Sequence, residues 1–474
     1  MSNLTGREKE AAFLKKLTQS TKAEFAVMYG RRRVGKTYLI RQVLGSSFTF
    51  YYTGVYNVKQ AQHLANFHAS LIKYSNGIDN IAPLNNWFEA FDALAKIAEK
   101  SSDEKKVIFI DELPWLDTPT SGFVPALEYF WNSWASNRSD VLLIACGSAA
   151  SWMINKLINN KGGLHNRVTQ RIKLEPFTLN ECEAFFKERK GVFDRYQLVQ
   201  LYMAFGGIPF YLDQVDVSLS AAQNINNLCF TKTGLLQNEF NNLYASLFKK
   251  SEKHVAVIEA LATKLKGLSR DELITKSKLA NSGNTTNLLK ELEESDFIRK
   301  YSSFGKTQRN VLYQLTDFYS LFYLRFIKSN NVMNENFWLT SIDSPGVRAW
   351  SGYAYEQVCL WHLPAIKKAL GISGIQTKAS AFAASDSNKN TQIDLVIDRR
   401  DHVINICEMK FSLDKFSITK KYADEIKNKI TVFKAETKTN KAIYFTMITS
   451  FGLEKNSYAT SLVQNELTMD DLFG

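Results

Sequence analysis

Eight residues near the N-terminus constrain the fold of this chain more than any other feature of its sequence. They match the pattern G-x-x-x-x-G-K-[ST] and read Gly30-Arg31-Arg32-Arg33-Val34-Gly35-Lys36-Thr37. An apolar run over residues 25–29 precedes them and predicts a buried strand, and residues 38–44 have helical spacing and stop at Gly45. A strand, a glycine-rich loop and a helix in this order predict an α/β fold with a phosphate-binding loop.

The residue types of this loop suit the phosphates of a nucleotide. The glycines let backbone N–H groups curl around a phosphate, and the N-terminus of the following helix adds partial positive charge. We expect Lys36 to reach the β- and γ-phosphates of ATP and the Thr37 hydroxyl to bind Mg²⁺. The loop therefore predicts a nucleotide site that works with magnesium.

A second acidic motif follows a later apolar run. Residues 107–110 are all apolar and are followed directly by Asp111 and Glu112, as in a Walker B strand. In open α/β sheets, ligands bind at the edge where such strands end. We expect Asp111 to hold Mg²⁺ through water and Glu112 to orient or deprotonate the attacking water. Strands at residues 25–29, 48–52, 106–110, 141–145 and 172–174 alternate with helical segments, which predicts a mostly parallel sheet.

Composition narrows the class of protein. The 474 residues suffice for two to four domains, and no apolar run approaches the ~18 residues that span a membrane. Five cysteines, Cys146, Cys182, Cys229, Cys359 and Cys407, have neither paired nor metal-ligand spacing, which favours a reducing cytoplasm. The net charge of +12 permits a nucleic-acid partner without demanding one.

Four further segments carry a resemblance: Gly6-Arg7-Glu8-Lys9-Glu10, Cys146-Gly147-Ser148, Leu164-His165-Asn166-Arg167 and Gly206-Gly207-Ile208-Pro209. With the loop and the acidic pair, they resemble the AAA-related ATPase family common in archaea and some bacteria. The resemblance implies that the first segment lies near the adenine and that Ser148 senses the γ-phosphate. It implies that Arg167 touches the γ-phosphate in cis or reaches a neighbouring subunit, which is compatible with a homo-oligomer. It further implies a helical lid, marked by the last segment, and a C-terminal nuclease-like domain.

Residues 250 to about 325 have the element order of a winged helix. Residues 254–263 have helical apolar spacing, Ser269 and Glu272 form a capping-box pattern before a second helix, and residues 284–294 predict a third. A β-hairpin over residues 299–316 with Gly305 at its tip follows. In a winged helix the third helix is the DNA reader. The residues on it that we expect to contact phosphate are Asn284, Thr285, Thr286, Asn287 and Lys290. The alternative is a spacer or protein-contact module.

The C-terminal segment carries a second cluster of charged residues. Asp394 lies in a predicted strand over residues 392–398, and a turn at 398–401 leads to a second strand over 403–411. Glu408 and Lys410 lie two residues apart in that strand, so they project from one face. A hairpin would bring Asp394 alongside them. Two carboxylates and a lysine are what metal-assisted phosphodiester hydrolysis needs.

This arrangement resembles the PD-(D/E)xK nuclease fold, in which a helix, here residues 349–363 with Glu356, precedes the strands. Strands at 374–384, 392–398 and 403–411, a helix at 419–434 and a strand at 442–446 complete the expected order. The resemblance implies that Glu356, Asp394 and Glu408 hold Mg²⁺ or Mn²⁺ and that Lys410 orients or activates water. The alternative is a degenerate fold whose carboxylates form a surface pair with Lys410.

Together these features predict four domains: a P-loop ATPase core at 1–180, a helical lid at 181–245, a winged helix at 246–328 and a nuclease-like α/β domain at 329–474. The predicted function is ATP binding and hydrolysis coupled to a metal-dependent DNA endonuclease, with DNA as partner and no membrane. The alternative is a nucleotide-dependent switch or DNA-binding regulator whose inactive nuclease fold docks a partner. A helicase-like motor finds no further motor motif in the sequence.

Overall fold

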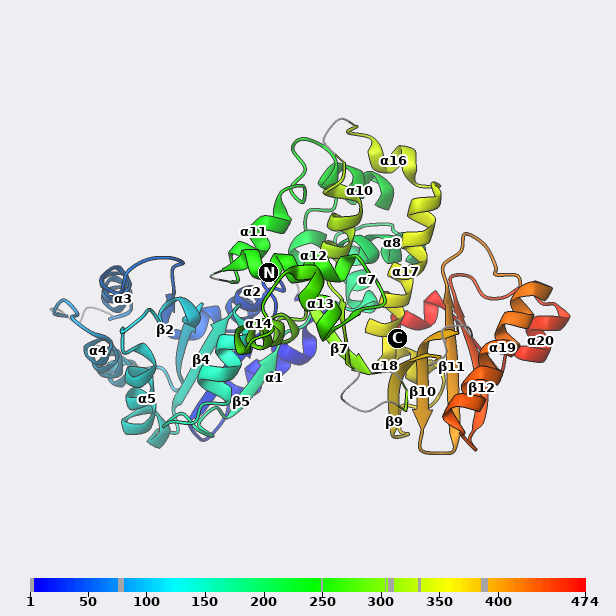
Figure 1. Cartoon of the computed structure of the whole chain (residues 1–474). Coiled ribbons are helices and arrows are strands. Elements are labelled where there is room, and N and C mark those ends of the chain that lie inside the picture. The colour runs from blue at the N-terminus through cyan, green and yellow to red at the C-terminus, as the bar shows by residue number, and fades with distance from the viewer. Residues whose placement is uncertain are drawn as a thin grey trace. The chain divides into compact units, whose positions relative to one another are not determined.

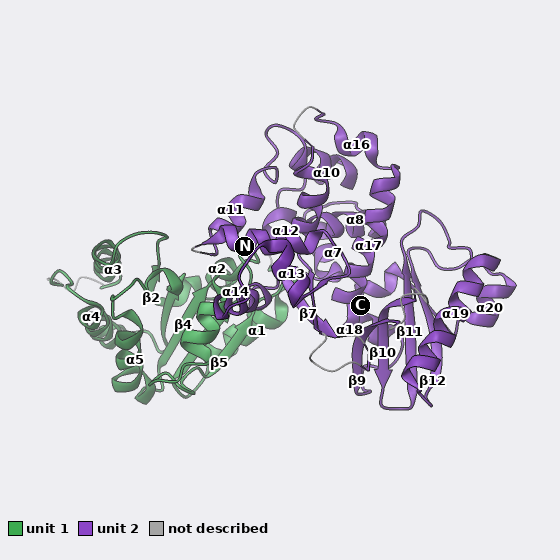
Figure 2. Ribbon diagram, viewed as in Figure 1, with its two compact units in different colours: residues 1–176 green, residues 177–474 purple. Residues whose placement is uncertain are grey.

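The structure is a computed structural model that describes residues 4–75, 81–248, 250–302, 304–305, 311–330, 334–384 and 391–474. The chain (Figure 1) divides into two compact units, unit 1 (Met1–Pro176) and unit 2 (Phe177–Gly474), which Figure 2 shows in different colours. The predicted domain boundaries at 180, 245 and 328 stay predictions. In the described part of the chain, no helix combines the length and the apolar character needed to cross a bilayer.

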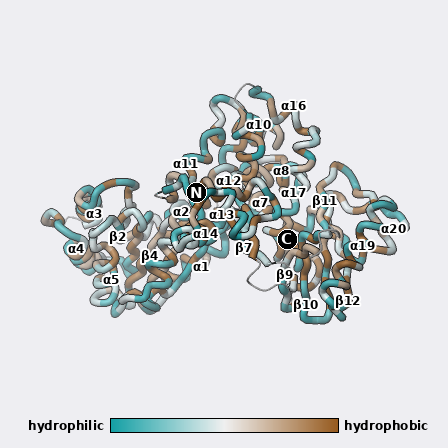
Figure 3. Tube along the Cα trace, viewed as in Figure 1, coloured by the Kyte–Doolittle hydropathy of each residue, from teal (hydrophilic) through white to brown (hydrophobic). Residues whose placement is uncertain are grey.

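Unit 1 is built on a five-stranded sheet in the order β2-β3-β4-β1-β5, in which all neighbouring strands are parallel. The strands are β1 (Glu24–Tyr29), β2 (Phe48–Thr53), β3 (Lys106–Asp111), β4 (Val141–Gly147) and β5 (Gln170–Lys173). The predicted strands are confirmed, although β5 begins two residues early. Every residue of β3 and β4 is buried, because helices cover both faces of a parallel sheet. Figure 3 shows the apolar residues of β4 in brown.

The helices of unit 1 supply the rest of its core. They are α1 (Glu8–Thr18), α2 (Lys36–Leu44), α3 (Gln60–Tyr74), α4 (Trp87–Lys100), α5 (Phe123–Ser133) and the short α6 (Ala150–Trp152). Phe67, Trp87, Phe91 and Phe123 pack edge-on or tilted, with ring centroids 5.0–6.3 Å apart. Such aromatic pairs add to the apolar burial that holds α3, α4 and α5 together.

Unit 2 begins with a series of helices that a small sheet interrupts along the chain. They are α7 (Leu179–Glu188), α8 (Arg195–Phe205), α9 (Pro209–Leu212), α10 (Ala221–Cys229), α11 (Glu239–Ala245), α12 (Ser251–Ala262), α13 (Arg270–Ser277), α14 (Gly283–Glu294), α15 (Phe318–Phe322), α16 (Phe337–Ser341), α17 (Pro345–Trp361) and α18 (Leu363–Ala369). Gly206 ends α8 in the left-handed region, at φ +68°. Gly207 follows at φ +66°, and a Cβ there would lie 2.2 Å from the carbonyl oxygen of Phe177. The backbone approaches too closely there for any other residue.

The middle of unit 2 follows the predicted order of three helices and a hairpin. The sheet has the order β6-β8-β7, with β6 (Leu268–Ser269), β7 (Ile298–Ser302) and β8 (Val311–Leu315). The capping box of Ser269 and Glu272 is confirmed. Gly305 is described, but the rest of the predicted hairpin tip, residues 303 and 306–310, lies outside the described residues. One expected phosphate contact on α14 is wrong, since Thr285 is buried and its hydroxyl donates to Ala280 O (2.6 Å).

The C-terminal sheet of unit 2 has the order β13-β12-β11-β10-β9. Its strands are β9 (Thr377–Ala383), β10 (Gln392–Arg399), β11 (Val403–Lys410), β12 (Ala442–Thr449) and β13 (Asn465–Thr468), accompanied by α19 (Lys420–Thr437) and α20 (Ser457–Leu462). The pairs β9–β10 and β10–β11 are antiparallel, and β11–β12 and β12–β13 are parallel. The predicted turn at 398–401 lies later, because β10 continues to Arg399.

This sheet packs its apolar residues against α19. Ile404 and Ile406 of β11 and Phe445 of β12 belong to one buried cluster with Ile426 and Phe433 of α19. Residues two apart in a strand share a face, so the helix covers one face of β11. The five cysteines of the chain are buried and free, in agreement with the predicted lack of a disulfide framework.

Candidate functional site

The phosphate loop of unit 1 connects β1 to α2 in a backbone shape that needs glycine. Gly30 has φ +140°, and a Cβ there would meet the carbonyl oxygen of Leu174 at 2.2 Å. Gly35 has φ +89° and immediately precedes α2, and Arg33 adopts a left-handed φ of +71°. Glycine takes such a backbone shape without strain, whereas a left-handed arginine is an uncommon conformation of the kind found where a backbone is shaped for a ligand. The fold thus presents the loop at the N-terminus of a helix, as the sequence predicts.

Lys36 is buried inside this loop. Its Nζ donates to the carbonyl oxygens of Gly30 (3.0 Å) and Arg31 (2.7 Å). Burial lowers the pKa of Lys36, and the nearby Cys146, Glu112 and Asp111 act in the opposite direction. The ammonium group therefore lies beside the loop backbone and near the two acidic residues that follow β3.

Asp111 and Thr37 bring two oxygen atoms together. The Thr37 hydroxyl donates to Asp111 Oδ2 over 2.6 Å, and Asp111 Oδ1 accepts from the backbone N–H of Glu112 (2.9 Å). Asp111 is buried at the end of β3. A hydroxyl and a carboxylate oxygen are hard ligands of the type that Mg²⁺ takes, so the two residues fit that ion chemically.

Glu112 and Ser148 form a pair that sequence reasoning missed. The Glu112 carboxylate accepts from the Ser148 hydroxyl (2.8 Å) and from the Ser148 backbone N–H (3.2 Å). Glu112 lies in the left-handed region at φ +47°, which aims its side chain at the end of the neighbouring strand. Glu112 is the first residue after β3 and Ser148 is the first residue after β4, and the two strands pair in parallel. Residues that directly follow parallel strands lie at the same edge of the sheet, and this rule could have predicted the pair from the sequence.

Arg7 lies in the segment that is expected near the adenine, and its side chain contacts the backbone of the phosphate loop. It is buried, and its Nη2 donates to the carbonyl oxygens of Glu175 (2.6 Å) and Val34 (3.4 Å). The guanidinium therefore ties the start of α1 to the phosphate loop. Its proximity to an adenine stays a prediction.

Arg167 is not brought to the phosphate loop. It is exposed and precedes β5, whose residue Gln170 pairs with Ala26 near the start of β1. The backbone N–H of Thr169 donates to Phe25 O (2.9 Å), which fixes this segment at the edge where β1 begins. The loop lies at the other edge, roughly 20 Å away along the strands at about 3.3 Å per residue. The cis interpretation of Arg167 does not fit this position.

The second candidate site lies on β10, β11 and α17 of unit 2. The antiparallel register pairs Leu395 of β10 with Cys407 of β11. Asp394 precedes Leu395 and Glu408 follows Cys407, so the two residues lie at neighbouring positions on adjacent strands. Glu408 is 3% exposed, and Lys410 Nζ lies 3.9 Å from its Oε2. The predicted hairpin is confirmed, with Asp394 on β10 and with Glu408 and Lys410 near each other on β11.

Two residues of α19 also reach Glu408. Lys429 Nζ donates to Glu408 Oε1, and the Tyr422 hydroxyl donates to Oε2 (3.3 Å). Lys429 was not predicted as a site residue. Tyr422 and Lys429 are seven residues apart, two helical turns, and therefore share a face of α19. That spacing was the signal that could have found them.

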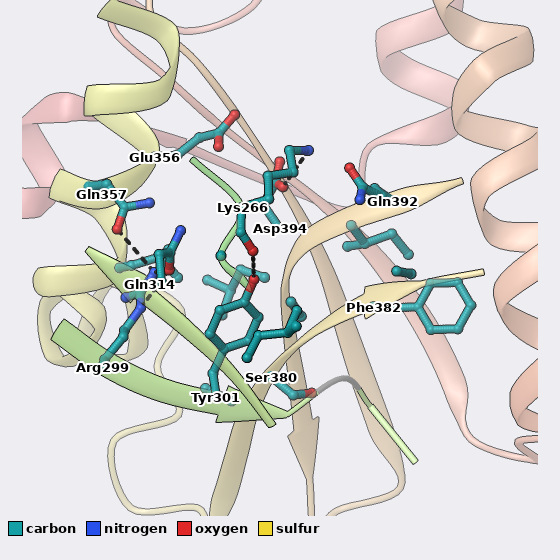
Figure 4. A pocket seen from close by; sticks show the side chains of 18 of the residues that line it. Lys266, Arg299, Tyr301, Gln314, Glu356, Gln357, Ser380, Phe382, Gln392 and Asp394 are labelled. Carbon is teal, nitrogen blue, oxygen red and sulfur yellow. Dashed lines mark hydrogen bonds and ion pairs between the residues drawn. The ribbon is translucent and has the colours of Figure 1, made fainter. Parts of the chain in front are cut away.

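Glu356 reaches the same charged cluster from α17. Burial raises the pKa of Glu356 to about 8, and the charges of Asp394 and, less strongly, Glu408 act in the same direction, while Lys266 and Lys410 oppose them. Figure 4 shows Glu356 and Asp394 with Lys266 beside a cavity of about 400 Å³. Carboxylates gathered in this way favour a bound cation.

These carboxylates are the right type of ligand for a divalent metal, but they are not arranged as a metal-binding group. Their oxygens are suitable ligands for Mg²⁺ or Mn²⁺. Within the described ranges, however, no group of three or more His, Cys, Asp or Glu side chains is spaced to hold a metal ion. Instead, Asp394 pairs with Lys266 at 3.1 Å and Glu408 pairs with Lys429 and Lys410. Lys266 gave no signal in the sequence.

Comparison with known proteins bears on the N-terminal region. Residues 4–215 match the family described as an ATPase domain predominantly from Archaea. An uncharacterized protein from Methanocaldococcus jannaschii is 25% identical over 357 residues, which cover 74% of this chain and 75% of that protein. The structure of a Walker-type ATPase of Pyrococcus abyssi is similar in fold, with a TM-score of 0.51, 17% identity, and coverage of 68% of this chain and 96% of that one. The family match supports an archaeal-type P-loop ATPase domain over residues 4–215, and with it ATP binding and hydrolysis. The similarity to the solved structure concerns the fold.

Proposed function

We propose that this chain is an ATPase whose nucleotide cycle controls a metal-dependent DNA nuclease site in unit 2. The observation that supports the nuclease part is the pairing of β10, which carries Asp394, with β11, which carries Glu408 and Lys410, while Glu356 of α17 lines the same cavity as Asp394. The ATPase part is supported by the family match over residues 4–215.

In the ATPase site, each polar residue has a distinct role. Lys36 neutralises the β- and γ-phosphates, and the loop N–H groups orient them. Thr37 and Asp111 would hold Mg²⁺, which supplies positive charge to the phosphates when it is bound. Glu112 accepts the proton of the attacking water, and Ser148 fixes the Glu112 carboxylate through two hydrogen bonds.

In the nuclease-like site, Glu356, Asp394 and Glu408 would hold Mg²⁺ or Mn²⁺, which supplies charge to a phosphodiester when it is bound. Lys410 orients or activates the attacking water. DNA is the proposed substrate, and exposed residues of α14 favour a phosphate backbone nearby. These are Asn284, Thr286, Asn287 and Lys290. Arg167 is proposed to act on the nucleotide of a neighbouring subunit.

A second candidate function is a nucleotide-dependent switch whose nuclease-like domain is inactive and docks a partner. One observation favours it: Asp394 and Glu408 are both paired with lysines, and the described residues include no group of three metal-binding side chains. A site that is neutralised by its own lysines has less need of a metal.

Cleavage and metal binding together separate the two functions. Purified protein is incubated with single- and double-stranded DNA and RNA, with ATP, Mg²⁺ and Mn²⁺ each present or absent. We expect Asp394→Ala and Lys410→Ala each to abolish cleavage while ATP hydrolysis stays largely intact. Mn²⁺ binding should be lost in Asp394→Ala and kept in Lys410→Ala, because Lys410 is not a ligand.

A matched control is Asp424→Ala on the exposed face of α19, where Asp424 pairs only loosely with Lys427 at 3.9 Å. It removes the same charge and should change neither cleavage nor Mn²⁺ binding. If the wild-type protein cuts no nucleic acid and binds no Mn²⁺ at Asp394 under any nucleotide condition, the docking function replaces the nuclease.

A further inference from the structure

One positively charged side chain at the nuclease-like site, Lys266, belongs to a segment outside the predicted nuclease-like domain. Lys266 lies in the segment between α12 and β6, and its Nζ is 3.1 Å from Asp394 Oδ1 (Figure 4). Its side chain is 46% exposed and that of Asp394 is 21% exposed, so the pair lies at the mouth of the cavity. Lys266 and Glu356 line the same cavity. The ammonium group of Lys266 therefore contacts one proposed metal ligand and lies in the same cavity as another.

The backbone around Lys266 is held in place. The hydroxyl of Tyr301, on β7, donates to the carbonyl oxygen of Lys266. The preceding carbonyl, of Leu265, accepts from Gln314 Nε2 (2.9 Å) and from the Tyr353 hydroxyl (2.8 Å). Three side chains from β7, β8 and α17 therefore fix two consecutive peptide groups.

Gly267 completes this fixed segment. It has φ +91°, and a Cβ there would meet the carbonyl oxygen of Tyr313 at 2.7 Å. The chain can pass β8 in this way only with glycine at this position. Lys266 is therefore presented to Asp394 by a shaped segment, unlike a surface lysine that meets a carboxylate by chance.

A lysine ammonium and a divalent cation cannot both bind Asp394 at full strength. Like charges about 4 Å apart repel strongly when they are partly shielded from water. An ammonium group also uses the carboxylate lone pairs that a metal needs. Both proposed ligands on the sheet have a lysine beside them: Lys266 is next to Asp394, and Lys410 and Lys429 are next to Glu408.

We propose that Lys266 is a built-in competitor of the divalent cation at Asp394. The inference rests on the proposed nuclease function, whose metal site it would regulate. Metal binds when Lys266 leaves Asp394, so the segment 265–267 and the strands that hold it, β7 and β8, set the metal affinity of a site on β10. Movement of the three-helix and hairpin module would in this way switch the nuclease-like site.

Manganese binding tests the competition directly. Free Mn²⁺ is measured by electron paramagnetic resonance during titration of the full chain without nucleotide. We expect Lys266→Met to bind Mn²⁺ more tightly than the wild type, on the order of tenfold or more, because a nearby like charge is removed. The double variant with Asp394→Ala should lose this gain, which identifies the site.

Lys264→Met is the matched control. Lys264 lies two residues away, carries the same charge and pairs with Glu272 at 2.8 Å. Its removal should leave Mn²⁺ affinity close to that of the wild type, so a gain confined to Lys266→Met excludes a general effect of charge. Tyr301→Phe keeps the lysine and removes only the hydroxyl that holds its carbonyl, and it should give a smaller gain in the same direction.

The outcomes separate this inference from the proposed function. If Lys266→Met and Tyr301→Phe both bind Mn²⁺ as the wild type does, while Asp394→Ala loses binding, the competition is refuted and the metal site stands. If Lys266→Met binds Mn²⁺ more tightly but no variant cuts nucleic acid, the competition stands and the nuclease proposal fails. Circular dichroism melting of each variant checks that the fold is intact.

Discussion

The carboxylates of the two acidic sites have different kinds of hydrogen-bond donor. In unit 1, Asp111 and Glu112 accept hydrogen bonds from uncharged donors, namely the hydroxyls of Thr37 and Ser148 and two backbone N–H groups. In unit 2, Asp394 and Glu408 are paired with the ammonium groups of three lysines.

Uncharged donors orient a carboxylate without cancelling its charge, whereas lysines both orient and neutralise it. The site in unit 1 therefore keeps its negative charge for a metal ion and is organised in advance. Under the proposed function, the site in unit 2 would exchange the ammonium group of a lysine for a metal ion before it could act. The difference predicts that the first site responds to its ligand alone and that the second also responds to the position of Lys266.

The largest effect is expected for Lys36→Ala, which should end both ATP binding and hydrolysis. Two charge-assisted contacts to phosphate are lost, and at about 1.5–3 kcal/mol each the affinity falls on the order of 10²–10⁴-fold. Mn²⁺ binding at Asp394 should not change. Calorimetry measures both, with Lys9→Ala on the exposed face of α1 as control. Unchanged ATP affinity would remove Lys36 from the nucleotide site.

Glu112→Gln should separate binding from chemistry in unit 1. The variant keeps Asp111 and Thr37, so ATP stays bound, but the water loses its base and hydrolysis slows by about 10²–10⁴-fold. Steady-state phosphate release measures the loss, and Glu104→Gln, an exposed residue before β3, is the control. Wild-type rates in Glu112→Gln would show that the base lies elsewhere.

Acid should destabilise unit 2 through His362. Its buried Nε2 accepts from the backbone N–H of Leu179 (2.9 Å), and burial lowers the pKa of His362 to about 4. The unfolded chain takes up a proton near pH 6.5, before the folded one does, so stability is lost as pH falls from about 6.5 to 4. The loss is about 3 kcal/mol at about 1.4 kcal/mol per pH unit.

Urea unfolding at pH 7 and pH 4.5 measures this loss. His362→Gln, which retains an acceptor but no titrating group, should show a weaker pH dependence than the wild type. The exposed His165→Gln serves as control. Equal pH dependence in all three proteins would mean that His362 takes up its proton over the same pH range in the folded and in the unfolded chain.

The smallest effect is expected for Ser148→Ala. Glu112 loses the hydroxyl hydrogen bond, worth about 1 kcal/mol, and the less firmly held carboxylate should lower ATP hydrolysis by up to about tenfold. ATP affinity should stay unchanged, and Ser151→Ala is the control. A faster rate in Ser148→Ala would reverse the interpretation, because Ser148 would then restrain Glu112 rather than position it.

The helices and strands of both units could be predicted well from the sequence, because buried residues recur in it in regular patterns. Continuous apolar runs mark β3 and β4, which are buried on both faces, and the capping box at Ser269 marks the start of α13. The cluster on β10 and β11 was accessible for a similar reason, because residues two apart in a strand share a face.

Contacts between residues that are far apart in the sequence produce no pattern of this kind and could not be predicted. Lys266 and Asp394 are 128 residues apart, and neither belongs to a pattern that predicts the other. The bond from Ser148 to Glu112 needs the strand order β3-β4, which short motifs do not state. Thr285 was misassigned because a helix with both polar and apolar residues does not reveal which threonine turns inward.

The position of Arg167 carries a consequence for the enzymology of the whole chain. If Arg167 acts on the nucleotide of a neighbouring subunit, as proposed, its contribution to hydrolysis has to be exchanged between molecules. The specific rate of ATP turnover would then rise with protein concentration, and an equal mixture of Arg167→Ala and Lys36→Ala chains, each idle alone, would recover part of the activity. The unit of catalysis would be a pair of neighbours, although each chain encodes every part.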